Sequence, residues 1–168
     1  MNRLTGVSLA AAFTLVLGPS LGGCGCFGGC KGSNPSRDES AVKGSSLYAR
    51  LGGLNGVAAV CDDFVDRLAA DKKIMSNPHV AEHAKTLSIP ALKFKLTAQV
   101  ACLTGGPWNY AGRDMKSIHA DMAITEAEWN ASVDDLRASL NKFKVPMKEQ
   151  NELIAIIAST HDDVVTRK

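Results

Sequence analysis

His119 is the histidine whose neighbours best fit metal chemistry. If residues 115–122 form a helix, Met115, Ile118 and Met122 share one face with it. Its imidazole would then point inward among apolar and thioether side chains. A histidine in that setting is either packed in the core or bound to a metal such as haem iron, for which a neutral imidazole is a common axial ligand. The spacing alone leaves both interpretations open.

Four amphipathic segments could position this histidine, and each is predicted to be a helix. Apolar side chains recur every three or four residues along 57–68, 92–103, 129–143 and 153–164. Pro90 suits a first helical turn, and Thr125 begins a capping-box sequence. No run of β-branched residues alternates with period two. We therefore expect an all-α domain of about five helices, joined by a long surface connection at 72–87.

The first 23 residues are similar to a lipoprotein-type signal peptide. Arg3 precedes an apolar run at 7–17 that is too short to span a bilayer. Residues 21–24, Leu-Gly-Gly-Cys, resemble the bacterial lipobox, in which the cysteine receives lipid. We expect residues 1–23 to be removed and the exported protein to be held by lipid on Cys24 at the periplasmic or cell-surface side of a membrane. An ordinary signal peptide that leaves Cys24 as a free thiol is the alternative.

Composition supports a division of the chain into a tether and one folded domain. Residues 24–46 are rich in glycine, serine and charge, which predicts a flexible tether, and they hold three of the five cysteines. The folded domain is predicted to span 47–168, a length typical of a single domain. The formal net charge of the whole chain is only +2. We therefore expect no nucleic-acid partner, because such partners need a concentrated basic surface.

Short motifs follow one another in an order that is typical of a known family. They are SLYARLGG at 46–53, DDF at 62–64, TGGP at 104–107, YAGRDM at 110–115, His119, and Ile-Thr at 124–125. Together they resemble the truncated haemoglobins of group I over about residues 47–165. The resemblance implies a two-over-two helical sandwich that holds haem b between the helix starting near Pro90 and the segment carrying His119.

The same resemblance assigns the residues on the proximal side of the haem. It makes His119 the ligand of the iron, with its other ring nitrogen donating to the Met115 carbonyl or to Ser117. Phe64 matches an aromatic position beside the haem. Proximal packing residues are implied at Met115, Ile118 and Met122. Arg113 or Lys116 could pair with a haem propionate, the alternative being a solvated surface charge.

The distal positions depart from the family pattern. Val65 stands where relatives usually carry tyrosine, and Leu92 and Leu96 stand where glutamine or histidine is frequent. Without a donor, bound oxygen forgoes a hydrogen bond worth about 1.5–3 kcal/mol when charge-assisted. We therefore expect weak oxygen binding, with carbon monoxide or nitric oxide relatively favoured. Gln99, three residues beyond Leu96, is expected to be an amide at the helix edge, the alternative being that it turns into the distal side.

The sequence thus predicts a tethered haem protein that reversibly binds diatomic gases (O2, NO or CO) and receives electrons from an unknown donor. The missing distal tyrosine and the lack of a recognisable reductase segment argue against an enzymatic role in nitric oxide dioxygenation. The alternative is an electron-transfer or sensing protein with a six-coordinate haem, in which His79 or His83 binds the distal position. We expect both histidines, like His161, to be exposed instead, because loops run over the surface.

Overall fold

A computed structural model describes residues 46–167, and this part of the chain is helical. The prediction of an all-α domain is confirmed. The predicted signal segment and all of the predicted tether except Ser46 lie outside the described residues. Among the described residues, no helix is long and apolar enough to cross a bilayer. The helices are α1 (Leu47–Arg50), α2 (Gly53–Ala70), α3 (Lys72–Met75), α4 (Pro78–Thr86), α5 (Ile89–Leu103), α6 (Met115–His119), α7 (Glu126–Lys142), α8 (Met147–Ala158) and α9 (His161–Val164).

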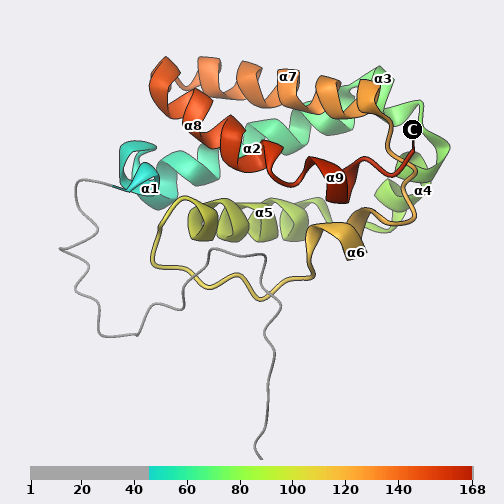
Figure 1. Ribbon diagram of the computed structural model, residues 1–168, viewed down its shortest axis with the longest axis horizontal. Helices are drawn as coiled ribbons and strands as arrows, with labels where there is room; N and C mark the ends of the chain where they lie inside the picture. The colour runs from blue at the N-terminus through green and yellow to red at the C-terminus, as the bar shows by residue number, and fades with distance from the viewer. Residues whose placement is uncertain (1–45, 168) are drawn as a thin grey trace, which may run out of the picture.

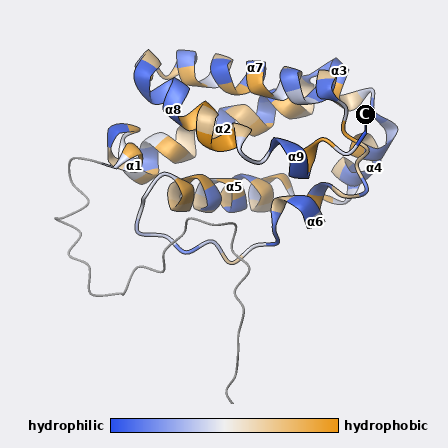
Figure 2. Cartoon of the chain, viewed as in Figure 1, coloured by the Kyte–Doolittle hydropathy of each residue, from blue (hydrophilic) through white to orange (hydrophobic). Residues whose placement is uncertain are grey.

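The four long helices form two pairs, one laid against the other (Figure 1). Helix α2 packs on α5 in the first pair and also contacts α7, which is followed by α8 in the second. The apolar faces of these helices point toward one another, and their polar faces point outward (Figure 2). Periodicity predicted all four, because each buries a stripe of side chains spaced three or four residues apart.

The entry to α2 depends on a close backbone approach. Gly52 and Gly53 both have positive φ, 91° and 64°, a region that glycine occupies without steric cost. One turn later, a Cβ on Gly56 would lie 1.9 Å from the carbonyl oxygen of Leu51. These glycines therefore allow the short helix α1 to fold back against the start of α2.

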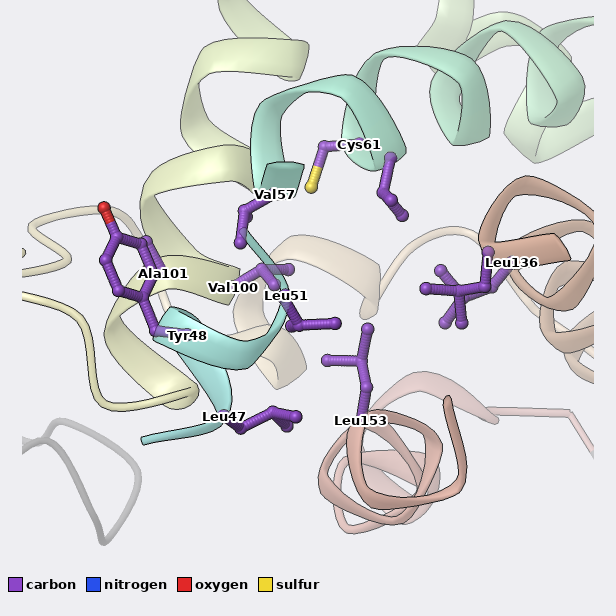
Figure 3. Packing of buried hydrophobic residues seen from close by; sticks show 11 residues of the cluster. Leu47, Tyr48, Leu51, Val57, Cys61, Val100, Ala101, Leu136 and Leu153 are labelled. Carbon is purple, nitrogen blue, oxygen red and sulfur yellow. The ribbon is translucent and has the colours of Figure 1, made fainter. Parts of the chain in front are cut away.

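The core is centred where α1 meets the long helices (Figure 3). Ala101 of α5 and Leu140 of α7 are fully buried, with 0% exposure. The backbone N–H of Tyr48 donates to the carbonyl of Thr104 at 2.9 Å, which ties α1 to the end of α5. The buried cluster comprises Leu47, Tyr48, Leu51, Val57, Val60, Cys61, Val100, Ala101, Leu136, Leu140 and Leu153.

The predicted surface connection at 72–87 is wrong, because this segment forms α3 and α4. Asn77 caps α4 by accepting from the N–H of His79 at 2.9 Å, and Pro78 supplies the first turn. The side chain of Asn77 is buried, and its Nδ2 donates to the carbonyls of Met122 and Ala123 at 3.0 and 3.3 Å. Helix α4 is therefore fixed against the segment between α6 and α7.

The last predicted helix is also shorter than its apolar pattern suggests. Helix α8 ends at Ala158, and Val164 lies in the separate helix α9, which packs against α6. The chain then returns to the start of α7, where the N–H of Thr166 donates to the carbonyl of Ile124 at 3.1 Å. The capping box at Thr125 is confirmed, and so is the start of α7.

Candidate functional site

One cavity of about 420 Å³ lies among α2, α4, α5, α6 and α7. Its volume is within the range of about 300–1,000 Å³ that is usual for small-molecule and cofactor sites. Its walls are mostly apolar, as such sites require. The structure brings all the site residues predicted from the sequence to this cavity, namely Phe64, Val65, Leu92, Leu96, Met115, Ile118, His119 and Met122.

His119 is held by its own helix. Its Nδ1 donates to the carbonyl oxygen of Met115 at 2.8 Å. Ser117, the other acceptor considered, is engaged elsewhere, because its hydroxyl donates to Asp114 at 2.7 Å and its N–H donates to the same carboxylate at 2.8 Å. With Nδ1 carrying the proton, Nε2 of the neutral ring keeps its lone pair, which is the form that binds a metal.

The surroundings of His119 favour this neutral form. Burial lowers the pKa of its imidazole, and the nearby charge of His83 lowers it further, while the hydrogen bond to Met115 acts in the opposite direction. The net effect places the pKa below its usual value. At neutral pH the side chain is therefore predominantly uncharged and ready to donate an electron pair.

His83 also lines the cavity, a position that the sequence analysis gave only as an alternative. It is half-buried, so the expectation that it is exposed is wrong, whereas His79 is exposed as predicted. The reason is helix α4 with its C-terminal cap, from which Val80, His83, Ala84 and the cap residue Leu87 line the cavity at spacings of three, one and three residues. That periodicity was present in the sequence, but it spans little more than two turns.

The wall formed by α2 and α5 is apolar at Val65, Leu92 and Leu96. Val65 is only 2% exposed, and Leu92 and Leu96 line the same cavity. Burial raises the pKa of the Cys61 thiol to about 12, although a hydrogen bond with Thr97 opposes this shift. Cys61 is therefore a neutral thiol at physiological pH and is not poised for redox chemistry.

Several polar side chains also reach the cavity. Gln99 lines it, so this residue lies closer to the site than its predicted place at the helix edge. Arg113 lines it as well, whereas Lys116 is exposed and does not. Lys95 and Tyr110 were missed in the sequence. Periodicity could have found Lys95, which follows Leu92 by three residues, but Tyr110 lies in an irregular loop.

Comparison with known proteins identifies this arrangement. The family described as bacterial-like globin matches residues 46–166 of the chain. The chain belongs to the bacterial-like globin family. Its haem cofactor and its capacity for diatomic gases follow from that membership.

Individual relatives of this globin agree. It is 29% identical over 122 residues to a group 1 truncated hemoglobin of Chlamydomonas moewusii, covering 71% of this chain and 68% of the relative. A group 1 truncated hemoglobin of Mycolicibacterium paratuberculosis is 26% identical, covering 73% and 85%. The structure of the ferric truncated hemoglobin from Tetrahymena pyriformis is similar with a TM-score of 0.65 and 25% identity, covering 72% of this chain and 98% of the other. The predicted two-over-two globin fold is confirmed.

Proposed function

We propose that this globin binds O2, NO or CO reversibly at a haem b whose iron is ligated by Nε2 of His119. The observation that carries the proposal is the state of that imidazole, which lines an apolar cavity with Nδ1 engaged by the Met115 carbonyl at 2.8 Å. When bound, haem supplies an iron with a coordination position for the gas. The residues of the chain hold the ring of His119, exclude water and set the polarity around the gas.

The apolar wall determines which gases are favoured. Val65, Leu92 and Leu96 offer no hydrogen-bond donor. A ligand that gains negative charge on binding, such as oxygen, is therefore stabilised less than one that remains nearly neutral, such as carbon monoxide. This preference supports gas carriage or sensing and argues against nitric oxide dioxygenation, which starts from a long-lived oxygen complex.

Spectroscopy of the full chain purified with haem tests the proposal. We expect a ferrous form that binds carbon monoxide reversibly and binds oxygen with rapid dissociation. A chain that takes up haem but shows no spectral change with either gas would contradict it.

We further propose that the globin is attached to a membrane by lipid on Cys24, supported by the lipobox-like residues 21–24. The test is membrane fractionation of cells that produce the Cys24→Ser variant, with Cys30→Ser as the matched control. Release of the first variant alone is expected. Retention of Cys24→Ser in the membrane fraction would exclude the lipid anchor.

A six-coordinate haem used in electron transfer or sensing is the second candidate, and the position of His83 supports it. This side chain lines the same cavity as His119 and is close enough for its charge to lower the pKa of His119. If His83 binds the iron, the ferric protein has a low-spin spectrum that His83→Ala abolishes and His79→Ala preserves. A high-spin ferric spectrum in the unmodified protein would exclude this candidate.

A further inference from the structure

The corner between α7 and α8, residues 142–148, exposes two large apolar side chains. Phe143 is 41% exposed and Met147 is 61% exposed, on either side of a tight turn. The turn is well fixed, because buried Gln150 donates to the carbonyl of Val145 at 2.8 Å and to Asn141 at 2.9 Å. The fold therefore holds these apolar side chains at the surface.

Lysines surround the two apolar side chains. Lys142 pairs with Asp63, and its ammonium lies 5.5 Å from the centroid of the Phe143 ring. Lys144 and Lys148 are exposed, and neither has an ion-pair partner among residues 46–167. Two uncompensated positive charges thus flank an apolar tip.

The acidic residues nearby do not neutralise these lysines. Glu149 accepts from Nε of Arg50 at 3.1 Å, and Glu152 also pairs with Arg50. Both carboxylates that follow the corner, Glu149 and Glu152, therefore form ion pairs with Arg50 of α1. Four cations, Lys142, Lys144, Lys148 and Arg50, stand against three carboxylates, Asp63, Glu149 and Glu152, so the net charge of this group is +1.

The same end of the molecule carries the start of the described chain. The Arg50–Glu149 ion pair joins α1 to α8, and Figure 1 shows α1 beside the α7–α8 corner at the left. Ser46, which caps α1, follows Cys24 by 22 residues in the sequence. A lipid on Cys24 would therefore connect to the globin at the end where the corner lies.

The other strongly exposed aromatic side chain differs in its charged neighbours. Phe94 of α5 is 66% exposed, but Lys93 before it is paired with Asp62 and Asp66, each at 2.8 Å, and Lys95 after it lines the cavity of the site already described. Leu87 and Ile89 line the cavity and are part of the site already described. The α7–α8 corner is thus the better match to a surface that is both apolar and anionic.

We propose that the α7–α8 corner docks on an anionic lipid surface, with Phe143 and Met147 entering the acyl boundary and Lys144 and Lys148 contacting the headgroups. Apolar side chains flanked by lysine are what such an interface accommodates. The proposal rests on the proposed lipid anchor only for bringing the corner to the membrane. Docking would orient the globin with its α3 end away from the bilayer (Figure 1).

Hydrogen exchange of the full haem-loaded chain, mixed with phospholipid vesicles, tests the docking. Backbone amides of residues 142–148 should exchange more slowly with vesicles containing phosphatidylglycerol than with pure phosphatidylcholine, and added salt should remove the difference. Each lysine near an anionic surface is worth about 1 kcal/mol, about fivefold in the docking constant. The double variant Lys144→Glu/Lys148→Glu should therefore weaken docking at least about 25-fold.

Lys72→Glu/Lys73→Glu is the matched control, because it makes the same charge change on exposed residues of α3 at the opposite end. This control should leave the vesicle-induced protection of residues 142–148 from hydrogen exchange unchanged. Phe143→Ser should reduce that protection, whereas Phe94→Ser should not. Equal exchange in the two kinds of vesicle would overturn the proposal. The proposal would also be overturned if residues 142–148 became protected without lipid as the protein concentration rises, because that result would show that a second copy of the chain covers the corner. Failure of docking leaves the fractionation result for Cys24→Ser intact, so the two proposals fail separately.

Discussion

Replacing Val65 with tyrosine should introduce a hydrogen-bond donor into the part of the cavity wall that Val65, Leu92 and Leu96 leave without one. Val65 is 2% exposed and lines the cavity of about 420 Å³. A hydroxyl there would donate to a ligand that gains negative charge, a contribution of about 1.5–3 kcal/mol. Each 1.36 kcal/mol changes a rate about tenfold, so oxygen dissociation should slow by about 10- to 150-fold. Carbon monoxide, which stays nearly neutral, should change less, by about 2- to 13-fold, since a neutral hydrogen bond contributes about 0.5–1.5 kcal/mol.

Val65→Phe is the control for this change. It adds the same aromatic ring, with an overpacking cost of about 1–3 kcal/mol that both variants share, but no hydroxyl. Stopped-flow displacement of oxygen by carbon monoxide gives the dissociation rate constants of both proteins. If the tyrosine and phenylalanine variants release oxygen equally fast, the apolar wall is not what sets oxygen affinity, and the reasoning is refuted.

Three further predictions concern stability and can be checked by urea unfolding. Asn77→Ala should lower the free energy of unfolding by about 2–3 kcal/mol, because the carbonyl groups of Met122 and Ala123 lose their hydrogen-bond donor. A loss below about 0.5 kcal/mol would contradict the role of this contact. Hydrogen bonds, chiefly with Asp162, raise the pKa of His161, so its stabilisation is complete below the usual histidine pKa and is lost as pH rises through the folded-state value. His161→Gln should therefore remove part of the fall in stability that begins as pH rises above the usual histidine pKa of about 6.5, and an unchanged pH profile would refute this. Hydrogen bonds, chiefly with Lys142, lower the pKa of Asp63, so its stabilisation is complete at neutral pH and declines progressively as pH falls below about 4. Asp63→Asn should be less stable than the unmodified protein at pH 7, and the difference should shrink as pH is lowered from about 4. Equal stability at pH 7 would contradict the role of this carboxylate.

Much of the fold could be predicted because its long helices bury apolar side chains at regular spacings of three and four residues. The α7 helix has apolar side chains at spacings of four and three and a capping box at Thr125, and it begins where predicted. The α4 helix has nine residues and no fully buried side chain, so its signal in sequence is weak. The position of α4 depends on Asn77, whose side-chain amide donates a hydrogen bond to the carbonyl of Met122, more than forty residues further along the chain.

The site could be predicted only in part, for a related reason. His119 and its helical neighbours share one short segment, so their common face follows from local geometry. His83 reaches the cavity because Asn77, which caps α4, is hydrogen-bonded to the segment between α6 and α7, a tertiary contact that the short periodicity of α4 does not reveal. Tyr110 lies in the loop before α6, and its hydroxyl donates to the carbonyl of Arg113 at 3.2 Å. The local sequence gives no indication that this ring lines the cavity.

Rescue of His119→Gly by free imidazole tests the assignment of the iron ligand most directly. Removing the side chain leaves space at the cavity wall, and imidazole added from solution can replace the missing ring. We expect the variant to lose the ferrous and carbon monoxide spectra of the unmodified protein and to regain them with imidazole, while His79→Gly keeps them throughout. Unchanged spectra in His119→Gly without imidazole would contradict the central claim that His119 ligates the haem iron.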